Sequence, residues 1–132
     1  MNECEVYFGI RGDHFDPAII TGALDIAPSR SVLSGIPTPK FSSWILSTGK
    51  VRGEAIDVYD LTSDLLIQLN PKSNKIKALL LEHNLFATLN VVISFSANPL
   101  ESTPAIGFSQ ETINFLSTVG ASIDIDTYRL ES

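Results

Sequence analysis

Cysteine is nearly absent from this sequence. Cys4 is the only cysteine among 132 residues, so no disulfide can form within the chain. A chain of this length buries roughly two-thirds of the surface that its unfolded form exposes, so it needs neither a disulfide nor a metal ion to hold it together. A lone cysteine is typical of proteins in a reducing compartment, and we expect a cytoplasmic protein.

Basic residues are also scarce. The chain has 9 Lys and Arg against 15 Asp and Glu, which gives a formal net charge of −6 and a pI near 4.7. Lysine and arginine drive binding to phosphate groups, so this balance disfavours nucleic acid and anionic membranes as partners. An acidic surface permits a basic protein partner, and it is also a common way to keep a protein in solution.

Long apolar runs are absent from the sequence. No run approaches the eighteen or so residues of a membrane span, and residues 1–13 lack the basic and apolar regions of a signal peptide. We therefore expect a soluble intracellular protein with no membrane partner. The length predicts a single domain over residues 1–132.

Recognisable catalytic motifs are missing as well. No G-x-S-x-G sequence marks a nucleophilic serine, and Gly9 and Gly12 lack the further spacing of a phosphate-binding loop. Cys4 belongs to an apolar strand pattern rather than to an electropositive cleft. We predict no catalytic residues, no metal and no cofactor, and these absences favour a protein that is not an enzyme.

The most informative stretch that is present runs from residue 108 to residue 128. Ser109 is a good N-cap, and Gly120 stands where a left-handed residue usually closes a helix. Beyond Gly120 the hydrophobic period changes to two, with Ile123 and Ile125 on one face. The other face carries Asp124, Asp126 and Tyr128. We predict a helix packed on a sheet whose last strand has one buried face.

Alternation of apolar and polar residues predicts three earlier strands, at residues 4–11, 43–47 and 86–96. Even-numbered residues of the first strand should face the core. The third strand loses its alternation at residues 91–93, which indicates burial on both of its faces. Residues 30–42, with two prolines and a glycine, are expected to form a long surface excursion, and residues 49–53 a turn.

Helix signals fill the segments between these strands. Asp16 followed by Pro17 predicts a helix that ends near residue 25. Leucines within residues 61–69 predict a second helix that is capped by Asp60 and ends at Asn70-Pro71. The same Asn70-Pro71 pair can cap a third helix that has Pro71 at its first position and extends to His83. Together these elements predict an α+β fold with a mixed or mainly antiparallel sheet and three to four helices packed mostly on one face.

A weak internal echo links two parts of the chain. A strand and a helix surround Phe15-Asp16-Pro17, and another strand and helix surround Phe108-Ser109-Gln110. Two βα units related by an approximate twofold would produce this pattern, and so would coincidence.

Three groups of polar or aromatic residues are candidates for a binding site. Asp13 and His14 lie at a strand-to-helix turn, where a metal would need further ligands and a solvated turn is the alternative. Asp124 and Asp126 are neighbours on one strand face. They could act as an acid–base pair, or they could protect an edge of the sheet from pairing with another strand. Trp44 is either a core residue or one wall of a pocket with an indole N–H donor.

Several of these motifs, taken together, resemble the bacterial domain of unknown function 4279. The resemblance lies in Phe8-x-Ile10-x-Gly12-Asp13, Phe15-Asp16-Pro17, Leu24-x-Ile26-x-Pro28, Trp44, Phe108-Ser109, the segment 116–120 and Asp124-Ile125-Asp126-x-Tyr128. Ser29 departs from the threonine expected after the Pro28 motif. The resemblance spans nearly the whole chain and implies a small stand-alone α/β domain from a bacterium. It implies no activity, cofactor or catalytic residue.

Three functions remain open at the level of the sequence. The first is a non-enzymatic protein-binding or interaction module, for example an immunity-type protein whose acidity suits a basic toxin. The second is a small-molecule-binding protein or small enzyme with a pocket near Trp44, Asp13 and His14. The third is a structural homo-oligomer whose edge strands pair.

Overall fold

The chain folds around one sheet, in a computed structural model that describes residues 1–35 and 38–131. In chain order the elements are β1 (Asn2–Gly12), α1 (Pro17–Leu24), β2 (Arg30–Val32), β3 (Ser42–Ser47), β4 (Val51–Gly53), α2 (Val58–Leu69), the 3₁₀ helix η1 (Asn70–Lys72), α3 (Ser73–His83), β5 (Phe86–Phe95), α4 (Gln110–Val119) and β6 (Ser122–Arg129). The strand order is β2-β3-β1-β5-β6, with β4 also paired to β1.

Strand β1 is the centre of the sheet. It pairs antiparallel with β5 along one side, and along the other it pairs first with β4 and then with β3. β5 and β6 form a parallel pair, because α4 carries the chain back to the start of the sheet between them. The prediction of an α+β domain with a mainly antiparallel sheet is therefore confirmed.

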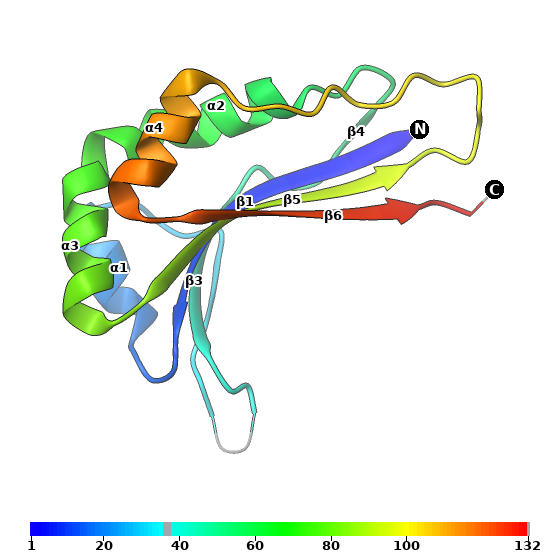
Figure 1. Ribbon diagram of the computed structural model, residues 1–132. Helices are drawn as coiled ribbons and strands as arrows, with labels where there is room; N and C mark the ends of the chain where they lie inside the picture. Colours follow the sequence, from blue (N-terminus) through cyan, green and yellow to red (C-terminus); the bar gives the residue numbers. More distant parts are fainter. Residues whose placement is uncertain (36–37, 132) are drawn as a thin grey trace.

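The helices cover one face of the sheet and leave the other face bare (Figure 1). Even-numbered residues of β1 point toward the helices and are buried, as predicted, and Phe8 and Ile10 have no exposed surface. The ring of Phe8 meets Phe115 of α4 edge to face, with 5.7 Å between centroids. Aromatic pairs prefer this geometry, and here it joins the helix layer to the central strand.

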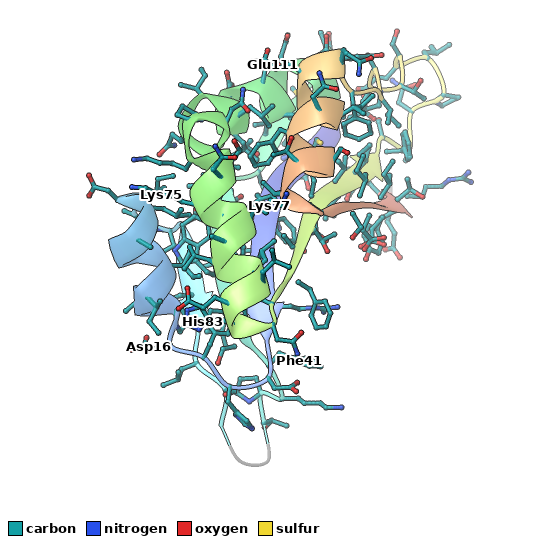
Figure 2. All side chains as sticks on the ribbon, turned by 60° about the vertical axis from the view of Figure 1, so that its left-hand side comes forward. Asp16, Phe41, Lys75, Lys77, His83 and Glu111 are labelled. Carbon is teal, nitrogen blue, oxygen red and sulfur yellow. The ribbon has the colours of Figure 1, made fainter. Side chains whose placement is uncertain are left out.

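Local signals fixed most helix ends correctly. Asp16 caps α1 by accepting a hydrogen bond from the Ala18 N–H, and Ser109 caps α4 by accepting one from the Thr112 N–H. Gly120 closes α4 in the left-handed region, with φ of 79°. A Gly or Asn in the left-handed region is the usual end of a helix. Figure 2 shows the helix layer that results.

Two predicted boundaries were wrong. Residues 49–53 were expected to form a turn, but β4 pairs with residues 2–4 of β1. The cap of α2 is Asp57, which accepts from the Tyr59 N–H, rather than Asp60. The apolar stripe of α2 begins one turn earlier than the leucines indicated, because Val58 is also buried.

Two predictions about burial were also wrong. β5 is buried only on its helix-facing side, because no second layer covers the other face of the sheet. β6 was expected to bury Ile123 and Ile125, but their exposed fractions are 40% and 42%, and all eight residues of β6 are exposed. β6 is the last strand of the sheet, so it has a neighbour on one side only.

The expected surface excursion at residues 30–42 is partly a strand. Residues 30–32 form β2, which pairs with β3, and residues 36 and 37 lie outside the described residues. The predicted internal repeat stays a prediction. β6 lies directly beside β5, whereas β3 separates β2 from β1.

Candidate functional site

The candidate site is the helix-free face of the sheet. Odd-numbered residues of β1 point to this face, and the strand register gives Tyr7, Gly9 and Arg11 neighbours on both β3 and β5. Tyr7 lies between Ser47 and Asn90, and Gly9 between Ile45 and Thr88. Side chains on this face are half-buried or exposed. The face therefore combines polar groups with apolar surface that nothing among residues 1–35 and 38–131 covers.

A pocket of about 440 Å³ opens on this face around Gly9. Gly9 has no side chain, and the larger Tyr7 and Arg11 stand on either side of it along β1. A Cβ at Gly9 would lie 3.6 Å from Asn90 Nδ2, an ordinary contact, so crowding does not require the glycine. The pocket is lined by Tyr7, Gly9, Ile10, Arg11, Ser43, Ile45, Thr88, Asn90, Ser122, Ile123 and Asp124.

Polar groups hold the β5–β6 side of the pocket. Thr88 Oγ1 and Ser122 Oγ lie 3.2 Å apart, and the Asn90 amide donates to the Thr88 carbonyl at 3.1 Å. Asp124 is the cross-strand neighbour of Asn90 and places a carboxylate on the same rim. On the opposite side the Arg11 guanidinium lies 5.4 Å from the Phe41 ring centroid. The pocket thus has an acidic rim and a basic rim.

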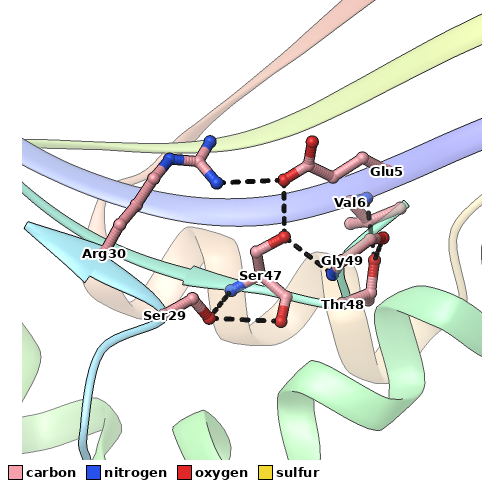
Figure 3. Close-up of polar contacts among 7 residues, drawn as sticks. All are labelled: Glu5, Val6, Ser29, Arg30, Ser47, Thr48 and Gly49. Carbon is pink, nitrogen blue, oxygen red and sulfur yellow. Dashed lines mark hydrogen bonds and ion pairs between the residues drawn. The ribbon is translucent and has the colours of Figure 1, made fainter.

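A second polar cluster lies further along the same face (Figure 3). Glu5 Oε2 accepts hydrogen bonds from Ser47 Oγ at 2.6 Å and from the Arg30 guanidinium at 3.2 Å. Ser47 Oγ in turn accepts from the Gly49 N–H, and the Ser29 hydroxyl accepts from the Ser47 N–H. The cluster ties β1 to β2 and to the end of β3.

The charges in this cluster alter the acidity of its members. Burial raises the pKa of Glu5, but hydrogen bonds from Ser47 and Arg30 and the nearby positive charge bring the pKa below its ordinary value. Arg30 also lies over the Tyr7 ring, 5.2 Å from its centroid. Burial raises the pKa of Tyr7; Arg30 opposes this, and Glu5, Asp126 and Asp124 add to it. Tyr7 therefore keeps its proton and can donate a hydrogen bond.

Cys4, the one cysteine of the chain, is poorly placed for covalent chemistry. Cys4 lies on the helix-covered face, and burial together with Glu5 raises the pKa of its thiol to about 11. A thiol with this pKa is almost entirely protonated at neutral pH and is a poor nucleophile. Across residues 1–35 and 38–131, no three His, Cys, Asp or Glu side chains converge into a group that would hold a metal ion.

The structure separates the residues that the sequence suggested. Trp44 lies on the helix-covered face with no exposed surface, and its indole N–H donates to Thr21 Oγ1 at 3.0 Å. Asp13 and His14 are exposed in the loop after β1, where His14 Nδ1 lies 3.0 Å from Ser34 Oγ. The two aspartates of β6 lie on the helix-free face, and one of them, Asp124, lines the pocket.

Sequence reasoning missed the centre of the pocket. Gly9, Tyr7 and Arg11 all occupy odd positions of β1, which the alternation had already assigned to the face away from the core. A glycine between two large side chains on that face was the available signal. Asn90 was not considered a site residue, because β5 was predicted to be buried on both faces.

These observations define a class: an α+β protein with helices on one face of its sheet and a polar, hollowed surface on the other. The family model described as "Domain of unknown function (DUF4279)" matches residues 2–130. The chain belongs to this family, as the motifs had indicated. No curated protein and no solved structure matches it. Within the described part of the chain, no helix is long and apolar enough to cross a membrane.

Proposed function

We propose that this protein is a non-enzymatic protein-binding module that contacts its partner through the helix-free face of the sheet. The observation that carries the proposal is the pocket of about 440 Å³ around Gly9, set in a face that no helix covers. Tyr7, Arg11 and Ile45 surround it. Tyrosine and arginine are enriched in protein interfaces, because both combine apolar surface with hydrogen-bond donors.

The charge of the molecule supports a basic partner. The formal net charge is −6, and within the described residues neither Asp124 nor Asp126 forms an ion pair. Complementary charge speeds association and selects partners. An immunity-type protein that neutralises a basic toxin is one concrete form of this function. We also propose a cytoplasmic location, supported by the single reduced cysteine, Cys4.

Filling the pocket tests this function. Gly9→Trp places an indole in the pocket without entering the core, since Gly9 faces away from the helices. Gly22→Trp is the matched control, because Gly22 is exposed on α1 and a Cβ there meets nothing within 4 Å. Crosslinking in the cells that make this protein identifies the proteins that contact the wild type. The control Gly22→Trp should crosslink to the same proteins, and Gly9→Trp should not.

The proposal fails if Gly9→Trp retains the same crosslinked proteins as the control. It also fails if the wild type, mixed with its crosslinked protein after purification of both, shows no binding by calorimetry. Circular dichroism and thermal unfolding of both variants establish that the fold is intact.

Binding of a small molecule, with or without catalysis, is the second candidate function. The pocket volume falls within the range of about 300–1,000 Å³ that is typical of small-molecule sites. We place this ligand at Gly9 rather than near Trp44, because the Trp44 side chain has no exposed surface. A polar metabolite that raises the unfolding temperature of the wild type and of Gly22→Trp, but not of Gly9→Trp, would favour this function over the first.

A further inference from the structure

Strand β6 forms an open edge of the sheet. It is the last strand in the order, and each of its eight residues is exposed. The Leu130 N–H, one residue beyond β6, donates to the Phe95 carbonyl at 2.8 Å. Backbone groups alternate in direction along a strand, so even-numbered residues of β6 turn their N–H and C=O toward β5. The N–H and C=O of Ile123, Ile125 and Thr127 therefore point away from the sheet.

The side chains of β6 differ between its two faces. Asp124 and Asp126 lie on the helix-free face, opposite Asn90 and Val92 of β5. Ile123 and Ile125 lie on the other face, with exposed fractions of 40% and 42%. Within the described residues the two aspartates have no cationic partner. The edge thus presents alternating carboxylates and apolar groups beside a row of free backbone donors and acceptors.

A second copy of β6 does not fit this edge. Two antiparallel copies related by a twofold overlap most when the axis passes at Ile125 or at Asp126. The first register places Asp124 opposite the Asp126 of the other copy, and the second places Asp126 opposite itself. Like charges directly opposite each other destabilise a strand pair. The two aspartates therefore oppose pairing between two copies of β6 and also favour a partner strand that carries positive charge.

We propose that β6 binds an extended segment of a partner protein as an additional strand of the sheet. The segment carries Lys or Arg opposite Asp124 and Asp126, and apolar residues opposite Ile123 and Ile125. This inference rests on the proposed protein-binding function and adds the mode of binding and the chemistry of the partner. Main-chain hydrogen bonds give such strand addition its affinity, and alternate side chains give it specificity.

Synthetic peptides test the pattern directly. The probe is an eight-residue peptide, matched to the eight residues of β6, with Lys and Val in strict alternation and a fluorescent label. A peptide of identical composition with its lysines clustered at one end is the control for charge alone. Fluorescence anisotropy should show the alternating peptide binding about tenfold more tightly than the clustered one. Equal binding of the two peptides would overturn the inference, because it would reduce the effect to charge.

Two variants test the edge itself. Ile125→Pro removes an outward N–H, and proline is tolerated on an edge strand when that N–H faces solvent. Ile125→Thr is the control, since it keeps the N–H. The alternating peptide should bind the threonine variant and not the proline variant. The double variant Asp124→Lys with Asp126→Lys should instead prefer a peptide in which Glu replaces Lys, even if the proline variant fails to fold.

The peptide experiment and the Gly9→Trp experiment can fail separately. If the alternating peptide binds no better than the clustered one while Gly9→Trp still loses its partner, strand addition is wrong, and the helix-free face remains the proposed binding surface. If the peptide binds as expected while Gly9→Trp keeps its partner, the edge is the binding surface and the pocket is not.

Discussion

The two faces of the sheet are built from the same strands and have opposite properties. On β3, Trp44 points to the helices and has no exposed surface, whereas the next residue, Ile45, points to the helix-free face and is only half-buried. On β1, Gly12 lies against the core and Gly9 opens a pocket. Stability and the proposed binding therefore depend on alternate residues of the same segments.

Substitutions on the two faces of the sheet should have different effects. The helix-covered face is apolar and close-packed, so lost atoms leave cavities there. The helix-free face holds ion pairs and hydrogen bonds that water already reaches, as in the cluster around Glu5. Changes on the first face should reduce the free energy of unfolding, and changes on the second should mainly alter binding. Two pairs of variants test the contrast between the faces, and a third pair compares two carboxylates on the helix-free face.

The largest difference is expected between Trp44→Ala and Ile45→Ala. Removing the Trp44 indole leaves a cavity and deprives Thr21 of its hydrogen-bond donor, at a cost of about 3–5 kcal/mol. Truncating the half-buried Ile45 should cost about 1 kcal/mol or less. Urea unfolding followed by circular dichroism measures both, because Trp44→Ala removes the only tryptophan of the chain. Similar losses in the two variants would show that the helix-free face is also part of the core.

A smaller difference is expected between Gly12→Ala and Gly9→Ala. The added methyl at Gly12 would lie 2.5 Å from Leu85 Cδ2, so that side chain must shift at a cost of about 1–2 kcal/mol. The methyl at Gly9 finds its nearest neighbour at 3.6 Å, and the change should stay within about 0.5 kcal/mol. Thermal unfolding distinguishes them. If Gly9→Ala is the more damaging, the pocket is not open as described.

The smallest effect is expected for Glu5→Gln, and it should depend on pH. Because the pKa of Glu5 is lower in the folded chain than its ordinary value of 4.5, its carboxylate stabilises the fold above that pH. The stabilisation disappears as the pH falls through the folded pKa. Glu5→Gln should therefore cost about 1 kcal/mol at pH 7 and progressively less below pH 4.5.

The control for this experiment is Glu3→Gln. Its partner is Arg52, at 3.5 Å in an exposed pair. Exposed pairs contribute little, so the loss at pH 7 should be smaller than for Glu5. Chemical denaturation from pH 3 to pH 8 provides the comparison. A cost for Glu5→Gln that does not change with pH would show that the charge of Glu5 plays no part.

Patterns within single segments predicted much of the fold. Alternation located β1, β3 and β5 and assigned the core-facing residues of β1, and short-range chemistry located Asp16, Ser109 and Gly120 at helix ends. The candidate site was less accessible, because its parts are far apart in the chain. Gly9 and Asp124 line one pocket although 115 positions separate them in the sequence. Only the shared sheet brings them together.

The sequence by itself determined which residues of each strand share a face, because side chains alternate along any extended chain. It also determined where several helices begin and end, since capping hydrogen bonds join residues a few positions apart. The pattern of elements also predicted helices packed mostly on one face, as the structure has them. The tertiary structure alone decided the order of the strands, which leaves β6 at the edge with both faces exposed. Strand order and layer packing depend on contacts between distant segments, and no local pattern encodes which partner a strand will find.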